Sequence, residues 1–345
     1  MSLLKSGHNP LLVGRQFLYS EPIRRPYSCF RLKILINSGP FFYACYNVQL
    51  FLYLLVKRVD VMLANDLDTL PAVYLVGRIR RKRIVYDSHE YFTEVPELVN
   101  RPRVQSIWRR IERRIFPHLK TVYTVNQSIA NIYQELYRVK VGSFPNYPLI
   151  QKGEPAIGSL PESFAGHPVI LYQGAVNVGR GLEEMIRAMV HLPEYRFLVV
   201  GGGDILDKLK GLVDTLKITD RVYFSGRVPF VDLAWYTRQA VLGISLEQDI
   251  GLNYHYSLPN KLFDYLHAGL PVLASDLPES GAIIRKVNCG VLVNRFDPQY
   301  LAETVRSMLN QPEQMELWHD NALKAAPNYT WENQELELVT TIIGS

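Results

Sequence analysis

The chain has 345 residues, which exceeds the usual size of a single domain and predicts two domains. Hydrophobic residues make up 48% of the sequence and charged residues 21%, as in an ordinary globular protein, and the net charge is +5. The three isolated cysteines exclude a disulfide framework and a cysteine metal site, which fits a reducing cytosol. The first residues show no charged n-region followed by a cleavage site, so no secretory signal is expected.

Strands and helices are predicted to alternate through the first half of the chain. Residues 2–8 read as the last turns of a helix with Gly7 just after its end, so we expect an upstream strand and a glycine-rich turn to be missing. The predicted strands cover residues 10–14, 32–36, 59–64, 83–87 and 121–125. The predicted helices cover residues 70–77, 104–116 and 128–136.

The first half is also the basic half, with arginine clusters at residues 78–83 and 101–114, and two of its segments raise the question of a membrane. Residues 41–56 are strongly apolar but shorter than the ~20 residues of a membrane span, so a buried helix is favoured. Residues 104–116 place apolar side chains on one helical face and arginines on the other. That pattern suits either an anionic membrane surface or an ordinary surface helix. Nucleic-acid binding is disfavoured, because no recognisable reading module accompanies the basic residues.

The chain is predicted to divide at a linker. Residues 151–167 are rich in Gly, Pro and Ser, so we expect domains at 1–150 and 168–327 and a last helical segment at 328–345. The strands of the second domain are predicted at residues 169–173, 197–200, 222–224, 242–246, 271–274 and 290–293. Its helices are predicted at residues 182–189, 205–216, 231–238, 259–268 and 298–309. Alternation in both halves predicts an α/β fold of two doubly wound Rossmann-like domains facing a cleft, where a ligand would bind.

The segment 256–272 is the most informative stretch. Pro259 is suited to open a helix, and the free amides of a helix N-terminus form an anion site. Lys261 adds a positive charge in the first turn, and Asp264 follows one turn later. This combination suits a sugar nucleotide, with phosphates at the helix end and ribose hydroxyls on the carboxylate. A well-capped core helix with two surface charges is the alternative.

Other predicted strand ends carry polar or flexible residues. Gly174 ends one strand, and Arg180 follows in a glycine-containing turn where it can grip phosphate. Residues 201–203 form a second glycine turn, but without the spacing of a dinucleotide fingerprint. His89 can contact a ligand hydroxyl, or be a loop histidine held by local hydrogen bonds.

Asp66 and Asp68 follow a strand of the first half as a D-x-D pair. Helix capping or contact with an acceptor molecule is favoured over metal, since no further carboxylates cluster nearby.

In these residues and their spacing, the chain resembles family-4-type retaining glycosyltransferases of the GT-B fold, also called glycosyl transferases group 1. That family shows two glutamates separated by seven residues, before a Gly-x-Pro-Val strand. Asp264 stands at the second glutamate, correctly spaced from residues 269–272, and Tyr256 replaces the first. The resemblance implies that Asp264 holds ribose hydroxyls. It also implies a donor-contacting histidine, His89, and a closing segment at residues 329–332 that leads back to the first domain.

The resemblance also implies two cations on the diphosphate. Arg180 stands at one of these positions, but Ala175 falls where the other is expected. Lys261 is placed to replace the missing cation. Glu247 and Asp249, in the preceding loop, are candidates to replace the missing sugar-binding carboxylate.

These arguments predict a retaining, metal-independent glycosyltransferase with no cofactor. The predicted catalytic residues are His89, Arg180 and Lys261. The predicted donor-binding residues are Gly174, Gly202, Arg227, Glu247, Ser257, Leu258, Pro259, Asn260 and Asp264. The predicted acceptor-side residues are Asp66, Asp68 and Glu90.

The expected partners are a nucleoside-diphosphate sugar and a glycan or lipid-linked acceptor. The expected location is the cytoplasm, with the anionic inner face of the membrane as a candidate peripheral site. The alternatives are a non-catalytic sugar-nucleotide-binding or scaffold protein and a GT-B nucleotide-sugar epimerase.

Overall fold

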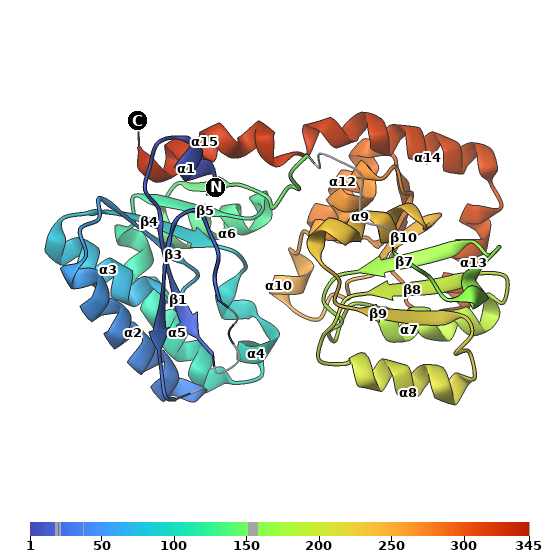
Figure 1. Ribbon diagram of the computed structural model, residues 1–345, viewed down its shortest axis with the longest axis horizontal. Coiled ribbons are helices and arrows are strands. Elements are labelled where there is room, and N and C mark those ends of the chain that lie inside the picture. The colour runs from blue at the N-terminus through green and yellow to red at the C-terminus, as the bar shows by residue number, and fades with distance from the viewer. Residues whose placement is uncertain (18–19, 21, 37, 151–157, 345) are drawn as a thin grey trace. The chain divides into compact units, whose positions relative to one another are not determined.

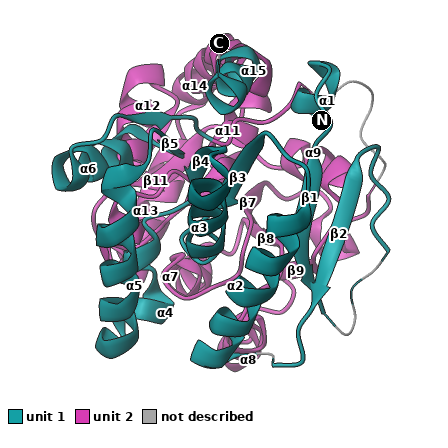
Figure 2. Cartoon of the chain, turned by 90° about the vertical axis from the view of Figure 1, so that its left-hand side faces the viewer, with its two compact units in different colours: residues 1–145, 334–345 teal, residues 146–333 magenta. Residues whose placement is uncertain are grey.

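The computed structural model describes residues 1–17, 20, 22–36, 38–150 and 158–344 (Figure 1). The chain divides into two compact units (Figure 2). Unit 1 contains Met1–Pro145 and Gln334–Ser345, and unit 2 contains Asn146–Asn333. Of the predicted linker, residues 151–157 lie outside the described part of the chain, and residues 158–167 belong to unit 2.

Unit 1 is built on parallel strands. Four strands form one sheet in the order β3-β4-β5-β6, and β1 and β2 form a separate parallel pair. The strands are β1 (Leu11–Gln16), β2 (Ser28–Lys33), β3 (Val61–Asn65), β4 (Arg83–Ser88), β5 (Thr121–Thr124) and β6 (Val141–Ser143). The helices are α1 (Ser2–Lys5), α2 (Gly39–Val56), α3 (Leu70–Arg80), α4 (Pro96–Val99), α5 (Pro102–Ile115), α6 (Gln127–Tyr137) and the end of α15 (Trp331–Ile343).

Helix α2 corrects one expectation. The apolar segment forms a helix as predicted, but it is not a buried one, since only Tyr46, Leu50 and Leu54 are buried. Helix α2 is also the one described helix that is long and apolar enough to cross a membrane, and only 17% of that 18-residue window is buried.

Helix α5 is amphipathic as predicted, and its apolar face is partly covered by unit 1. Trp108 is buried and stacks edge-on against Tyr43 and Phe92, with ring centroids 5.2 and 5.4 Å away. Arg109 forms an ion pair of 2.6 Å with Glu94. Trp108 and Ile115 of the apolar face are buried in the unit, whereas Ile107 of the same face is 52% exposed, so α5 packs as a surface helix whose apolar face is only partly covered.

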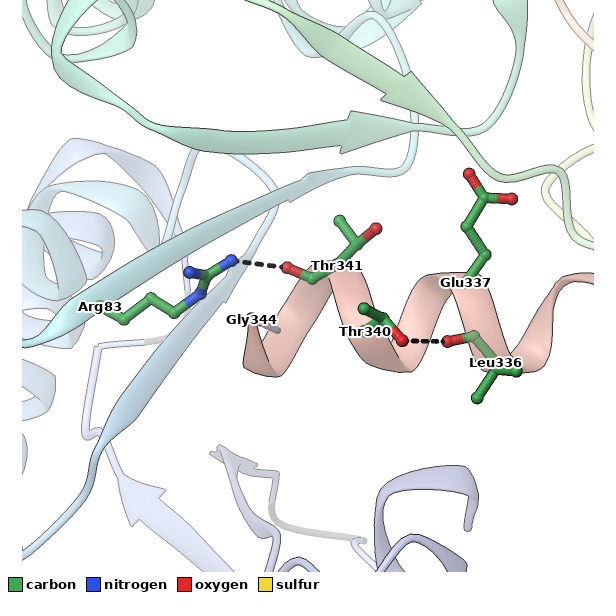
Figure 3. Close-up of a pocket in the computed structure, with 6 residues that line it drawn as sticks. All are labelled: Arg83, Leu336, Glu337, Thr340, Thr341 and Gly344. Carbon is green, nitrogen blue, oxygen red and sulfur yellow. Dashed lines mark hydrogen bonds between the residues drawn. The ribbon is translucent and has the colours of Figure 1, made fainter.

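The last helix is held in unit 1 by Arg83, at the start of β4. Its guanidinium donates hydrogen bonds to the carbonyls of Thr341 and Ile342, at 2.9 and 3.0 Å. Figure 3 shows this side chain pointing at the end of α15, beside an open surface pocket. These bonds satisfy carbonyl groups that every helix C-terminus leaves unpaired, so Arg83 anchors the helix.

Unit 2 is a six-stranded parallel sheet with helices on both faces. The strands are β7 (Val169–Gln173), β8 (Arg196–Val200), β9 (Val222–Gly226), β10 (Leu242–Ser245), β11 (Val272–Ser275) and β12 (Gly290–Val293). The helices are α7 (Leu182–Ala188), α8 (Leu206–Leu216), α9 (Phe230–Arg238), α10 (Leu252–His255), α11 (Asn260–His267), α12 (Pro278–Val287), α13 (Pro298–Leu309) and α14 (Pro312–Ala325). One core cluster joins the sheet to α7, α8 and α13, and another joins it to α11 and α12.

The strand order of this sheet, β12-β11-β10-β7-β8-β9, decides where a ligand can bind. The chain adds strands outward from β7 in one direction and then returns to add β10, β11 and β12 on the other side. In such sheets the ligand crevice lies at the carboxyl ends of the two strands where the direction reverses. For unit 2, that point is the end of β7 and β10.

Some elements differ from the sequence-based expectation. Strand β2 spans Ser28–Lys33 rather than residues 32–36, and Leu35 is 99% exposed. Strand β6 and the helices α12 and α14 are elements that the sequence reading missed. Apolar content alone placed β2 too late, because a parallel pair is set by backbone register as well as by hydrophobicity.

Candidate active site

A buried carboxylate organises the carboxyl ends of β7 and β10. Glu247, two residues beyond β10, is 1% exposed. One of its oxygens, Oε1, lies 2.8 Å from Lys261 Nζ and 3.5 Å from an Nη atom of Arg180, and the other accepts a 2.6 Å hydrogen bond from Ser245 Oγ. The structure thus brings together three predicted site residues as a cluster with one net positive charge.

The protonation of this cluster follows from burial opposed by charge. Burial lowers the pKa of Lys261 to about 8, although Glu247 opposes that shift. Burial works to raise the pKa of Glu247, but Lys261 and Arg180 outweigh it and leave that pKa below its usual value. For Arg180, burial is outweighed by Glu247 and the pKa is raised. At neutral pH the three groups are therefore two cations and one anion.

Aromatic rings hold the two cations in place. Lys261 Nζ lies 3.9 Å from the ring centroid of Tyr172, and the Arg180 guanidinium lies 4.9 Å from that of Tyr254. Tyr254 in turn donates a hydrogen bond to the carbonyl of Val178, in the turn that carries Arg180. Cation–π contacts of this kind strengthen when water is excluded, so the rings help to fix both charges.

Donors without acceptors mark this cluster as suited to an anion. The Nε atom of Arg180 and the Oγ atom of Ser257 are buried and have no hydrogen-bond partner among the described residues. A buried donor left unpaired costs free energy. A phosphate oxygen is an acceptor of the kind that the buried Arg180 Nε lacks, and Ser257, in the loop before α11, has the same need.

Glycine turns let the backbone come close beside the cluster. Gly174, at the end of β7, has φ of +126°, and a Cβ there would lie 3.6 Å from Lys261 Cε. Gly201 has φ of +144°, and a Cβ there would lie 1.9 Å from the carbonyl oxygen of Gly174. Gly202 lies in the same turn, where a Cβ would lie 3.1 Å from Arg227 Cγ. Gly174 and Gly201 therefore occupy backbone conformations that favour glycine. The second turn also places Gly202 beside Arg227.

Asp264 lies one helical turn after Lys261, in a different set of contacts. Its Oδ2 accepts a 2.7 Å hydrogen bond from Gln173 Nε2, and Thr237 Oγ1 donates to the amide oxygen of Gln173. Burial raises the pKa of Asp264 to about 6. Asp264 also lines a pocket of about 200 Å³ together with Leu233 and other residues of α9, α11 and segment 148–150.

The start of α11 differs slightly from the prediction. Pro259 is the N-cap, with ψ of 132°, so Asn260 rather than Pro259 is the first helical residue. Asn260 is exposed, and Leu258 is half-buried against the core of unit 2. The alternative of a core helix with two surface charges is wrong for Lys261, because its amine is buried against Glu247.

The predicted residues of unit 1 form a second polar cluster, at the carboxyl ends of β3 and β4. Asp66 adopts a left-handed φ of 59°, and its Oδ1 accepts a 2.9 Å hydrogen bond from the His89 backbone amide. His89 Nε2 lies 3.2 Å from Asp87 Oδ2, and that carboxylate also accepts a 3.0 Å hydrogen bond from Tyr123. Strain at a non-glycine residue such as Asp66 is typical of functional loops.

Electrostatics sets the protonation of this second cluster. The hydrogen bond to Asp87 raises the pKa of His89, and burial raises the pKa of Asp68 to about 6. Capping is the wrong explanation for Asp66, because its carboxylate bonds His89 and the N-cap of α3 is Thr69. Glu90 follows His89 and is half-buried. Among the described residues, no three His, Cys, Asp or Glu side chains are grouped to hold a metal ion.

Several contributors to these clusters were missed from the sequence. Gln173 and Ser245 are the last residues of β7 and β10, and Asp87 and Tyr123 lie one residue before the ends of β4 and β5. The signal available was a polar residue at the last position of an apolar run, which marks the ligand-binding edge of a parallel sheet. Nothing in the sequence showed which of them would meet Asp264 or His89.

The family model of the glycosyl transferases group 1 matches residues 161–325, which include Arg180, Glu247, Lys261 and Asp264. Residues 161–325 belong to this family. This group 1 domain contains the whole polar cluster of unit 2, whereas Asp66 and His89 lie outside the matched segment.

Relatives and solved structures agree with that assignment. The lipopolysaccharide glucosyltransferase WaaG of Escherichia coli is 29% identical over 160 residues, 44% of this chain. The chain spans about two fifths of the length of the curated relatives it matches, at 40% of each. The sucrose-phosphate synthase structure from Thermosynechococcus elongatus matches with a TM-score of 0.75 and 18% identity, covering 98% of this chain and 89% of that one.

HepE of Anabaena in complex with UDP-glucose matches with a TM-score of 0.69 and 14% identity, covering 91% of this chain and 85% of that one. These structural similarities confirm the α/β fold with two parallel sheets, the GT-B architecture that the sequence predicts.

Proposed function

We propose that this protein is a retaining glycosyltransferase that uses a nucleoside-diphosphate sugar, with UDP as the nucleotide. The buried cluster of Arg180, Lys261 and Glu247 at the ends of β7 and β10 carries the proposal. It offers two cations and unpaired donors where a group 1 domain reverses its strand order. The choice of UDP is supported by the UDP-glucose complex of the structurally similar HepE.

The proposed chemistry needs no protein nucleophile. The bond between the sugar anomeric carbon and the diphosphate oxygen breaks, and a bond to the acceptor oxygen forms on the same face. The departing diphosphate takes the acceptor proton. Arg180 and Lys261 stabilise the negative charge that develops on the leaving group, and such preorganised electrostatic stabilisation is usually the largest catalytic contribution.

Glu247 fits this chemistry better as a partner of the cations than as a ligand of the sugar. Its two carboxylate oxygens already accept hydrogen bonds from Lys261 and Ser245. It neutralises part of the positive charge before the donor binds, and it aims both cations at one point. We therefore assign it to the donor site through Arg180 and Lys261.

The remaining predicted residues receive roles at the two ends of the donor. Asp264 holds the ribose hydroxyls, and the turn of Gly202 and Arg227 lies beside the nucleotide. His89, whose pKa is raised by its hydrogen bond to Asp87, orients the donor sugar. Asp66, Asp68 and Glu90 contact the acceptor, which we propose to be a surface glycan or a lipid-linked sugar at the cytoplasmic face of the membrane. The lipopolysaccharide glucosyltransferase named among the relatives supports that acceptor class.

Ligand-induced thermal stabilisation tests the donor first. UDP, GDP, ADP and their sugars are added in turn, since a ligand that binds only the folded state raises the melting temperature by mass action. We expect UDP and at least one UDP-sugar to stabilise the protein. Arg180→Ala combined with Lys261→Ala should abolish both the shift and turnover, and wild-type turnover in this double variant would refute the assignment.

A non-catalytic sugar-nucleotide-binding protein is the alternative with specific support. Ala175 and Tyr256 stand where a cation and a carboxylate are expected in the family. Such a protein would bind UDP but release no UDP from a UDP-sugar. Product analysis without an acceptor also distinguishes an epimerase, which would convert the sugar nucleotide without transfer.

A further inference from the structure

Helix α2 presents an apolar side to solvent. Five residues spaced three or four positions apart, Phe41, Ala44, Val48, Leu52 and Leu55, are exposed and form one stripe. At 1.5 Å per residue the stripe is about 21 Å long. Phe41 is 76% exposed and Leu52 is 56% exposed.

Asn47, a polar residue of α2, lies on the inner side of the helix rather than toward solvent. A surface helix normally keeps its polar residues toward solvent. Here Asn47 faces unit 1, where its amide donates to the carbonyls of Tyr43 and Asp68 and accepts from the backbone of Ala72. Helix α2 is therefore secured to the unit by hydrogen bonds on its inner side, and its outer side is apolar without interruption.

The neighbouring helix extends this surface and adds charge. Helix α3 packs beside α2 (Figure 1), and its Leu75 and Ile79 are 52% and 62% exposed. Neither helix contains an acidic residue. The ends of the two helices meet, because Arg80 donates a 2.9 Å hydrogen bond to the Leu54 carbonyl.

Exposed cations surround that shared end: Lys57, Arg58, Arg78 and Arg81. The nearest carboxylate, Asp60, forms an ion pair with Lys82 and leaves these four cations in excess.

We propose that the outer surface of α2 and α3 docks onto an anionic lipid bilayer. The apolar stripe enters the boundary between headgroups and acyl chains, and the four cations at the helix ends meet the lipid phosphates. An interfacial helix of this kind lies in the plane of the membrane and combines buried apolar area with attraction to anionic lipid. The inference concerns unit 1 alone and does not depend on the donor assignment.

Two observations select this mode over the other occupants of an apolar face. A membrane-spanning α2 would have to leave the contacts of Tyr46, Leu50 and Leu54 and the hydrogen bonds of Asn47. A second copy of the chain would bring the like charges of Lys57, Arg58, Arg78 and Arg81 together, whereas an anionic membrane neutralises them.

Vesicle co-sedimentation of the full chain tests the proposal. Vesicles of phosphatidylcholine alone are compared with vesicles that contain about one third phosphatidylglycerol. Val48→Glu combined with Leu52→Glu alters the stripe, and Leu136→Glu on α6, where the leucine is also 56% exposed, is the matched control. We expect binding to the anionic vesicles, at least tenfold weaker binding by the α2 variant on an order-of-magnitude estimate, and unchanged binding by the control.

A series of charge-removing variants separates the contribution of these four cations to binding from that of the basic helix α5. Arg58→Gln with Arg78→Gln should weaken binding at low salt by roughly fivefold for each charge removed. Arg113→Gln with Arg114→Gln on α5 removes the same charge and should change binding by less than about twofold, because screening confines the effect to nearby charges.

Folding is checked independently of binding. Circular dichroism shows whether the α2 variant is folded. If the glutamate variant unfolds, Leu52→Trp provides an independent test, because its tryptophan fluorescence should shift to shorter wavelength when anionic vesicles are added, by more than the fluorescence of the wild type does. Equal binding by the α2 variant and wild type, absence of wild-type binding, or a larger effect of the Arg113 and Arg114 pair than of the Arg58 and Arg78 pair would each overturn the proposal. A stable dimer in solution that protects Leu52→Trp from vesicles would also overturn it.

Discussion

Replacing Lys261 with Met tests the electrostatic basis of the proposed reaction. Methionine keeps much of the length of the side chain and removes the charge, so the 2.8 Å contact with Glu247 is lost while the space stays filled. By analogy with the loss of one oxyanion donor, turnover should fall ~100- to 1,000-fold, which corresponds to about 2.7–4 kcal/mol of transition-state stabilisation.

The same substitution has a calculable effect on folding. Glu247 is 1% exposed, and it would lose its nearest cation, but Arg180 remains 3.5 Å away and Ser245 still donates a hydrogen bond. We therefore expect the free energy of unfolding to fall by about 1–3 kcal/mol, the cost of leaving a buried polar group poorly satisfied. Adding Glu247→Gln to Lys261→Met removes the uncompensated charge and should restore part of that loss.

The assay pairs UDP release from a UDP-sugar with a denaturant titration of each variant. The double variant should regain stability without regaining activity, because the charge that supports the leaving group is still absent. Turnover that recovers along with stability would show that Lys261 matters only for folding and would refute the reasoning.

Three further predictions concern residues around the two clusters. The pKa of Asp264 is about 6 and that of Lys261 about 8, so kcat/KM should fall as pH drops through about 6 and as it rises through about 8. Asp264→Asn should remove the acidic limb of this profile and the preference for UDP over 2′-deoxy-UDP. A flat pH profile of the wild type would contradict both assignments. Gly201→Ala should destabilise unit 2 by at least about 2 kcal/mol in chemical unfolding, because its φ is positive and a Cβ there clashes with backbone. Gly211→Ala, on α8 with open space around it, should stabilise unit 2 by about 0.5–1 kcal/mol. Equal effects of the two substitutions would be inconsistent with the close turn at Gly201. The contact with Asp87 raises the pKa of His89, so the contact stabilises the fold fully below the unfolded pKa of about 6.5, and this stabilisation is lost as pH rises through the folded pKa. In an NMR titration, Asp87→Asn should lower the pKa of His89. An unchanged pKa in that variant would contradict the pairing.

Much of unit 2 could be predicted from local pattern. Strand β7 is a continuous apolar run that is fully buried, and α13 begins and ends where its periodicity places it. The spacing between Asp264 and the strand that follows α11 identified the most informative segment. These features depend on neighbours in the sequence, so they can be read without the fold.

The pairing within the site could not be predicted in the same way. Lys261 and Glu247 are separated by thirteen residues and Gln173 and Asp264 by ninety, and only the strand order brings each pair together. An exposed charge at a helix end and a buried ion pair share one sequence pattern. The distinction depends on the loop after β10 folding back over the amine of Lys261.

The apolar helix α2 shows a limit of hydropathy. Its composition indicates burial, and its length falls just short of a typical span, so a core helix was the natural prediction. The structure shows instead that Asn47 faces inward and Leu52 outward. Periodicity cannot reveal this reversal when nearly every position of a helix is apolar.

The most direct test of the central claim is single-turnover release of UDP from a UDP-sugar by the wild-type chain and by the Arg180→Ala, Lys261→Ala double variant, with the anomeric configuration of the product read by NMR. We expect UDP release and a product with the configuration of the donor for the wild type, and no release above background for the variant. Equal release by the two proteins, or a product of inverted configuration, would contradict the claim.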